Sequence, residues 1–192
     1  MVAADVAAGE LRAWTAPDAG QDALRHALLA FLDARPVDAC DRSCVPGHLT
    51  ASALLLDAAA EHTLLTLHPR VGRWIQLGGH CEPSDESLRA AALREAAEES
   101  GIEGLVIDPA PLHLDVHPVT CSLGVPTRHL DVRYLVRAPA GAVPRISAES
   151  DDLRWWPLDA LPADDDTVAT MVAAARSRAG QASEPCQKKS SL

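Results

Sequence analysis

The chain has 192 residues, a formal net charge of −10 and a pI of about 5.1. This acidic balance argues against general nucleic-acid binding, and against attachment to an anionic membrane, through a basic surface. A small phosphorylated substrate remains compatible with it, because a bound metal ion and a few arginines can invert the local field. The sequence has no apolar run of 18 residues, no signal-peptide pattern and an odd count of five cysteines, so we expect a cytoplasmic protein.

Residues 1–45 predict a helical extension followed by a loop. Two helices are expected between about residues 3 and 35, and in the second of them Leu24, Leu28 and Leu32 recur at helical spacing. We interpret this extension as a cap packed on the outside of the domain that follows. A substrate lid or a dimerisation element is the alternative.

The loop after these helices carries two cysteines. Cys40, Cys44 and His48 are spaced four residues apart, but this spacing matches no common zinc module. We therefore expect ordinary buried or loop thiols here.

The next segment predicts the opening strands of a sheet. Runs of small and apolar residues over 48–56 and 62–67 are typical of the two strands of a β-hairpin. A basic loop with Arg70 and Arg73 then leads into a short strand over 74–77. The two arginines are positioned to contact a phosphate group, or else they are solvated loop charges.

The stretch from Gly78 to Ile102 begins with a glycine pair, passes through a short acidic loop and continues as a helix. Ser84 is placed to act as the N-cap, and the acidic residues after it suit the positive end of the helix dipole. The Ala, Leu, Arg and Glu content favours a helix. Gly101 is expected to end it as a left-handed cap.

Three glutamates share one arc of this helix. Glu95, Glu98 and Glu99 are spaced at i, i+3 and i+4, which places them within about 100° of one another. The same face is apolar one and two turns earlier, so it is expected to face the protein. Like charges at this spacing repel by about 1–4 kcal/mol per pair, and a divalent cation would offset the repulsion. Oxygen ligands favour Mg²⁺ or Mn²⁺, and Arg94 can pair with Glu98 to orient a ligand.

A family resemblance rests on this helix. Its sequence from Arg94 to Ile102, R-E-A-A-E-E-S-G-I, is similar to the second half of the Nudix box, R-E-U-x-E-E-x-G-U, where U is a bulky aliphatic residue. In the full pattern, G-x5-E-x7-R-E-U-x-E-E-x-G-U, the isolated glutamate falls on Glu86, with Asp85 as a substitute. The glycine falls one residue after Gly79, so the loop holds one extra residue.

The resemblance implies a Nudix fold. This is an α/β (α+β) architecture in which a mixed β-sheet is sandwiched between helices, here with the N-terminal helical extension added. We expect the Nudix domain to cover residues 46–179, and residues 180–192 to form a disordered tail.

Two later strands alternate apolar residues with polar ones. Because alternate side chains of a strand share a face, each strand presents one polar face. We interpret these faces as the lining of a substrate groove that contacts a diphosphate or ribose; the alternative is the wet side of a half-exposed sheet. The candidate substrate contacts are His113, His117, His129 and Asp131.

The C-terminal part predicts an acidic loop, an aromatic strand ending at Pro157, and a closing helix over 164–178. The family often has a similar arrangement, in which the loop supplies an extra carboxylate to the metal site. Glu149 is the candidate for this role.

The resemblance implies hydrolysis of a diphosphate linkage in a nucleoside diphosphate joined to another moiety, or in a related phosphorylated small molecule. Mg²⁺ or Mn²⁺ would be held by Glu95, Glu98 and Glu99, and Glu98, Glu99 or Glu149 would orient or deprotonate the water. The supporting residues are Arg94 and Glu86, with Gly78 and Gly79 letting the backbone approach the substrate.

Two alternatives come from other classes. One is a non-catalytic module of the same fold that binds a nucleotide for regulation. The other is an enzyme similar to isopentenyl diphosphate isomerase. His80 and Cys81 suggest this alternative, although that enzyme's cysteine motif is missing. A homodimer is common in the resembled family.

Overall fold

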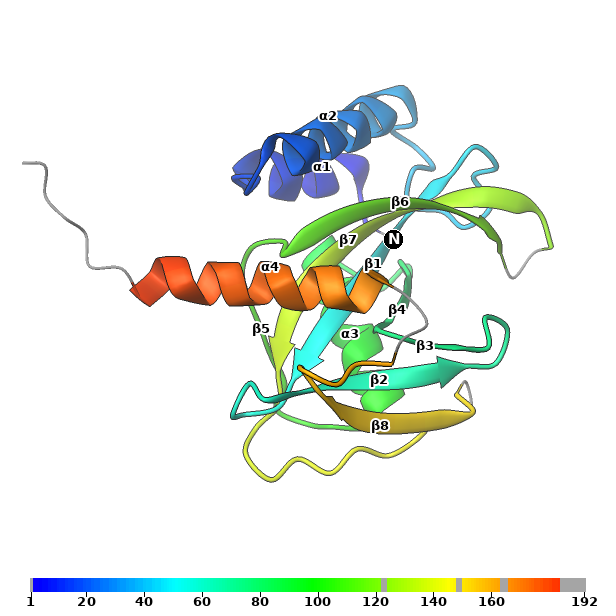
Figure 1. Ribbon diagram of the computed structural model, residues 1–192. Helices are drawn as coiled ribbons and strands as arrows, with labels where there is room; N and C mark the ends of the chain where they lie inside the picture. The colour runs from blue at the N-terminus through cyan, green and yellow to red at the C-terminus, as the bar shows by residue number, and fades with distance from the viewer. Residues whose placement is uncertain (1, 122–123, 148–149, 163–165, 184–192) are drawn as a thin grey trace, which may run out of the picture.

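The computed structural model describes residues 2–121, 124–147, 150–162 and 166–183 (Figure 1). The elements in chain order are α1 (Ala4–Ala13), α2 (Ala19–Ala34), β1 (His48–Leu56), β2 (His62–His68), β3 (Arg73–Ile75), β4 (Leu77–His80), α3 (Leu88–Ser100), β5 (Val106–Ile107), β6 (His113–Thr120), β7 (Pro126–Arg137), β8 (Asp152–Pro157) and α4 (Asp166–Ser183). A curled mixed sheet lies between α3 and α4, with α1 and α2 above one end, which confirms the expected fold class. None of the helices described here is long and apolar enough to cross a membrane.

Strand β1 is at the centre of the sheet. It pairs in parallel with β7 along its whole length, from His48 beside His129 to Leu56 beside Arg137. Its other edge is shared by β4 and β2, both antiparallel to it. Strands β3 and β8 pair with β2, and β5 and β6 pair with β7. The hairpin expected from the first two strands, β1 and β2, is confirmed.

All of β1 is buried, and helices cover both faces of its second half. Leu54 packs in one cluster with Met171 of α4, whereas Leu55 packs in another with Ala96 of α3. A strand covered on both faces needs apolar residues at successive positions. This explains the continuous apolar run in the second half of β1.

Helices α1 and α2 contribute to the core. Leu11, Trp14 and Leu28 are buried in one cluster with Leu88 of α3 and Tyr134 of β7. The extension therefore packs its apolar face onto the domain and adds to the hydrophobic core, while residues such as Asp5, Arg12 and His26 on its outer side are exposed.

Helix α3 begins later than predicted. Its N-cap is Ser87, whose hydroxyl accepts a hydrogen bond from the backbone N–H of Ala90 at 3.0 Å, and not Ser84. The three residues after Ser84 are occupied by a loop in which Asp85 accepts a hydrogen bond from the Glu82 N–H at 2.7 Å. The C-terminal end agrees with the prediction, because Gly101 has a left-handed φ of 62°.

Helix α1 also reaches the start of α3. The Glu10 carboxylate accepts hydrogen bonds from the backbone N–H groups of Leu88 at 3.0 Å and Arg89 at 3.4 Å. Burial raises the pKa of Glu10, and these hydrogen bonds act in the opposite direction without cancelling the rise. The N-terminal extension is thus joined directly to the helix that carries the box.

Helix α4 is longer than predicted. It continues to Ser183, so residues 180–183 are helical where a disordered tail was expected. The alanines and arginines of its last turns are good helix formers, which lets the helix continue past Gly180. Residues 184–192 lie outside the described part of the chain.

Candidate active site

The three glutamates stand at the C-terminal half of α3 beside the end of β4. The Glu99 carboxylate accepts a hydrogen bond from the backbone N–H of Gly78 at 2.9 Å, and Glu99 is 8% exposed. The side chain of Glu95 is 14% exposed and that of Glu98 is 60% exposed. These three glutamates form the carboxylate arc. Its members range from Glu99, which is buried and bound to the sheet, to Glu98, which is open to solvent.

The glycine pair is required by close packing against β1 and α3. Gly78 has a φ of 148°, and an added Cβ would lie 2.4 Å from the Cβ of Ser52. An added Cβ on Gly79 would lie 2.7 Å from Oε1 of Glu95. Close packing against Ser52 and Glu95 is therefore one reason for glycine at both positions, and the approach of a substrate to this backbone stays a prediction.

Arg94 is held at the base of the arc. Its guanidinium donates to both carboxylate oxygens of Asp85 at 3.0 Å, to Glu98 at 2.9 Å and to the backbone oxygen of His80 at 2.9 Å. Burial acts to raise the pKa of Asp85, but the hydrogen bonds with Arg94 and the Glu82 backbone outweigh it and the pKa is lowered.

Of the two candidates for the supporting role, Glu86 and its substitute Asp85, it is Asp85 that contacts Arg94. The Asp85 side chain is 4% exposed and bound to Arg94, whereas Glu86 is exposed to solvent. The late start of α3 explains the difference between the two residues. The longer loop turns the preceding residue, not Glu86, towards the arginine.

A polar row crosses the opposite face of the sheet, next to the apolar patch that α4 covers. Its members alternate with the core residues of β1 and β7, and the strand register pairs His48 with His129, Thr50 with Asp131, and Ser52 with Arg133. Asp131 is 3% exposed and accepts hydrogen bonds from Thr50 at 3.0 Å, Ser52 at 2.8 Å and Arg133 at 2.8 Å.

Two of the predicted substrate contacts are engaged with other protein groups. Asp131 is buried and hydrogen-bonded within the sheet. His113 lies against α2, where its Nε2 is 3.0 Å from the Gln21 amide nitrogen. His117 is partly exposed and bound to Asp115, with 2.7 Å between Nδ1 and the carboxylate. This face is more enclosed than the wet side of a half-exposed sheet, because Asp131 and Arg133 are 3% and 2% exposed, and the role of its side chains as substrate contacts stays a prediction.

At one end of the polar row, four side chains from four segments converge. His48 begins β1, His80 ends β4, Cys121 follows β6, and His129 lies on β7. One ligand atom from each lies within 4.8 Å of the others. Of these four, the sequence predicted His129 as a substrate contact, while His48 was considered with Cys40 and Cys44 and His80 with Cys81. His48 and His80 each stand at a strand end, but nothing in their spacing indicates that they meet.

His48 is buried and His80 and His129 are partly buried, and burial is the largest influence on the pKa of each imidazole. It lowers the pKa of His48, with the Cys44 backbone acting in the opposite direction. It lowers the pKa of His80 to about 4 and that of His129 to about 3, with neighbouring histidines adding to both shifts. All three rings are therefore neutral near pH 7.

The remaining predicted site residues lie elsewhere. Arg70 and Arg73 are exposed around the turn between β2 and β3. Glu149 falls outside the described residues. Cys81 is buried in one core cluster with Cys40, and this thiol contact together with burial raises the pKa of Cys81.

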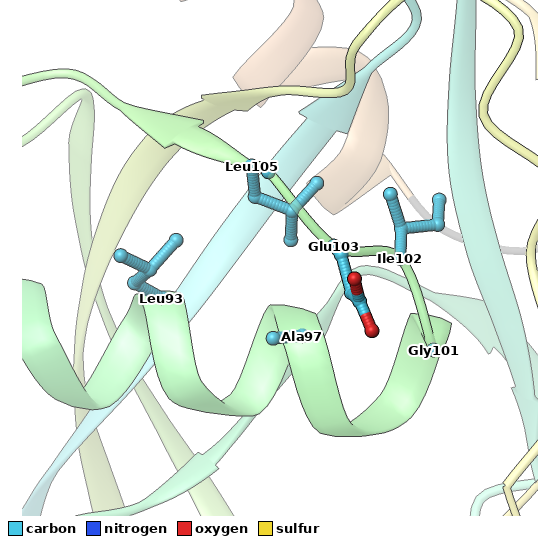
Figure 2. A pocket seen from close by; sticks show the side chains of 7 residues that line it. Leu93, Ala97, Gly101, Ile102, Glu103 and Leu105 are labelled. Carbon is cyan, nitrogen blue, oxygen red and sulfur yellow. The ribbon is translucent and has the colours of Figure 1, made fainter.

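The cavity at the end of α3 is separate from the glutamates. It has a volume of about 480 Å³ and is lined by α3 and the segment after it, including Leu93, Ala97 and Leu105 (Figure 2). Leu93 and Ala97 lie on a different side of the helix from Glu95, Glu98 and Glu99. Apart from the Glu103 carboxylate, the side chains that line it are apolar, so it offers little for binding a phosphate.

Comparison with known proteins identifies the family. The family profile described as the NUDIX domain matches residues 46–175, and the chain belongs to the Nudix family. A search among curated proteins finds no match to this chain.

Solved structures share the fold at low identity. An Ap4A hydrolase from C. elegans in a binary complex is 20% identical, with a TM-score of 0.53 over 69% of this chain and 98% of that one. A MutT protein from Methanosarcina mazei Go1 is 22% identical, with a TM-score of 0.53 over 70% and 97%. The NUDIX domain of Shewanella oneidensis NrtR, solved with ADP ribose, is 23% identical, with a TM-score of 0.51 over 78% and 97%.

Proposed function

We propose that this protein is a metal-dependent hydrolase that cleaves a diphosphate linkage in a nucleoside diphosphate joined to another moiety, or in a related phosphorylated small molecule. The observation that carries the proposal is the carboxylate arc of α3. Glu95, Glu98 and Glu99 stand together at the helix end, with Glu99 bound to the Gly78 N–H and Arg94 fixed by Asp85. Membership of the Nudix family supports the same reaction class.

The donor set fits Mg²⁺ or Mn²⁺. The candidate ligands are carboxylate oxygens from Glu95, Glu98 and Glu99, and the exposure of Glu98 leaves room for the water molecules that these ions retain. When bound, such an ion neutralises charge on the phosphate oxygens and lowers the pKa of a coordinated water.

The protein's own groups supply position and a base. Glu99 is tied to the sheet, which suits a ligand whose position must stay constant. Glu98 is the most exposed of the three glutamates, so it is the best placed to orient or deprotonate the attacking water. Arg94 donates a hydrogen bond of 2.9 Å to Glu98. It also binds the His80 backbone oxygen, which connects the arc to the end of β4.

The test is a hydrolysis screen of the purified full chain with nucleoside triphosphates, ADP-ribose and other sugar nucleotides, dinucleoside polyphosphates, NADH and coenzyme A. Each substrate is assayed with Mg²⁺, Mn²⁺ or EDTA. We expect metal-dependent release of phosphate, diphosphate or a nucleoside monophosphate. Glu98→Gln should lower kcat by at least about a hundredfold, because it removes a base without removing bulk.

Glu103→Gln is the matched control, since it makes the same chemical change on the cavity side of the helix end. It should leave kcat within about twofold of the parent protein. Equal activity of Glu98→Gln and the parent would remove Glu98 from the mechanism. Saturable binding of a nucleotide with no turnover of any substrate would replace the hydrolase proposal with a binding module.

A further inference from the structure

We infer that His48, His80, His129 and Cys121 form a structural zinc site, separate from the carboxylate arc of the proposed hydrolase. The inference starts from convergence. Side chains from the start of β1, the end of β4, the segment after β6 and the middle of β7 bring one ligand atom each to within 4.8 Å of the others. In the part of the chain that the structure describes, this is the one group of three or more histidine, cysteine or acidic residues that meets this distance.

The histidine rings have the spacing that tetrahedral zinc requires. Three imidazoles bound at about 2.0–2.1 Å in tetrahedral positions have ring centres about 5.2 Å apart. The ring centres of His48, His80 and His129 are separated by 5.1 Å, 5.0 Å and 5.2 Å. They therefore form an almost equilateral triangle of the size expected around one ion.

Cys121 is the fourth ligand of the inferred tetrahedral site. For a sulfur ligand at about 2.3 Å, the distance from sulfur to each ligating nitrogen is about 3.5 Å. The Cys121 Sγ atom lies 3.2 Å from Nε2 of His80 and 3.9 Å from Nε2 of His48, on either side of that value. Small side-chain rotations would equalise these distances without moving the backbone.

The positions of the three histidines follow from strand register. His48 and His129 are direct partners on β1 and β7, and His80 is the partner of Thr50, two residues beyond His48. Residues two apart on a strand share a face, so all three rings project from the same face of three adjacent strands. A site built on hydrogen-bonded strands is held more rigidly than one built on loops.

The cluster also contains polar atoms that the protein does not satisfy. Nε2 of His129 is buried and has no hydrogen-bond partner among the described residues. Nδ1 of His48 is likewise buried without a hydrogen-bond partner among the described residues, and His48 is fully buried. Burying unpaired polar atoms is unfavourable, and a metal ion would remove the penalty by accepting their lone pairs.

The ligand atoms of this cluster favour zinc over other ions. Three nitrogens and one sulfur suit Zn²⁺ and disfavour Mg²⁺ or Ca²⁺, which take oxygen ligands. Four protein ligands fill a tetrahedral shell and leave no open position, which is the mark of a structural rather than a catalytic zinc site. Binding would release the Cys121 thiol proton to solvent, because the thiolate is the form that ligates.

The site would hold together the strands that carry the proposed active site. His80 is the residue after Gly79, and its backbone oxygen accepts a hydrogen bond from Arg94 at 2.9 Å. Zinc at His80 would therefore anchor the end of β4 next to the carboxylate arc, while His48 and His129 fix β1 to β7.

The experiment measures metal content and then ligation. Full-length protein purified without a metal-affinity tag is analysed by mass spectrometry for metals, and we expect about one zinc per chain. The zinc is then removed and replaced by Co²⁺, for which we expect the intense visible bands of a tetrahedral site and a thiolate-to-cobalt charge-transfer band. Cys121→Ser should abolish the charge-transfer band, and His129→Asn should raise the Kd for Co²⁺ by at least about tenfold.

Control variants test whether the ion is bound at this cluster. Cys81→Ser and His117→Gln change a neighbouring thiol and a neighbouring imidazole outside the cluster, and both should keep the cobalt spectrum. Glu99→Gln should keep it too, which separates this site from the carboxylate arc. If Cys121→Ser does not fold, His80→Asn takes its place, because His80 is partly exposed. Zinc well below one per chain together with no tetrahedral cobalt spectrum, or a charge-transfer band that survives Cys121→Ser, would overturn the inference.

Discussion

The carboxylate arc of α3 and the histidine–cysteine cluster on the sheet are two polar regions built in opposite ways. The arc lies within five consecutive residues of one helix, and one of its members is 60% exposed. The cluster is assembled from four segments spread between residues 48 and 129 and is largely buried. The arc offers oxygen ligands and access to solvent, as chemistry on a phosphate requires, whereas the cluster offers nitrogen and sulfur in a closed shell, as structural binding requires.

The two regions are nevertheless linked. Arg94 binds Glu98 of the arc and the backbone oxygen of His80 in the cluster. Variants can therefore separate a region whose loss affects turnover from a region whose loss affects stability. We expect four outcomes, one for turnover at the arc and three for stability at contacts outside the cluster, from the largest effect to the smallest.

Glu99→Gln should lower kcat by about a thousandfold while leaving the melting temperature nearly unchanged. A glutamine oxygen can still accept the hydrogen bond from the Gly78 N–H, so the fold keeps its contact, but the charge that would hold a metal ion is gone. Steady-state kinetics with Mg²⁺ and a thermal melt measure the two effects. A melting temperature that falls in step with activity would show that Glu99 is structural.

Asp131→Ala should destabilise the protein by about 3 kcal/mol. The change leaves Thr50, Ser52 and the Arg133 guanidinium without their shared acceptor on a buried face of the sheet. Urea unfolding followed by tryptophan fluorescence gives the free energy of unfolding. Asp159→Ala, on an exposed turn after β8, is the control and should change it by less than about 0.5 kcal/mol.

Glu10→Ala should destabilise the protein by about 1 kcal/mol. It removes the carboxylate that accepts hydrogen bonds from the first N–H groups of α3, which is the role of a helix cap. The same urea experiment measures the loss. An unchanged free energy of unfolding would mean that Ser87 alone caps the helix.

The Asp85 and Arg94 pair should make stability depend on acid pH. The pKa of Asp85 is lowered in the folded protein, so its contribution is complete above the unfolded-state pKa of about 3.9 and is lost as the pH falls through the folded value. Unfolding free energies measured between pH 6 and pH 3 should therefore decrease more steeply for the parent than for Asp85→Asn. Parallel curves for the two proteins would contradict this assignment.

Sequence reasoning was most successful where the signal lay within one element. The period-two strands, the helical spacing of the N-terminal extension and the R-E-x-x-E-E stretch each depend on neighbouring residues, and the fold class they predict is confirmed. The left-handed cap at Gly101 is local in the same sense. Element ends were less certain, as the start of α3 at Leu88 and the end of α4 at Ser183 show.

Only the tertiary structure decided which polar residues meet. The sequence predicted a polar strand face at residues 129–133, but β1 had to pair in parallel with β7 before Thr50 and Ser52 could bind Asp131. The choice of Asp85 over Glu86 depended in the same way on the path of the loop before α3. The physical reason is that helix and strand periods are set by the local backbone, whereas strand register and loop path are set by packing of the whole core.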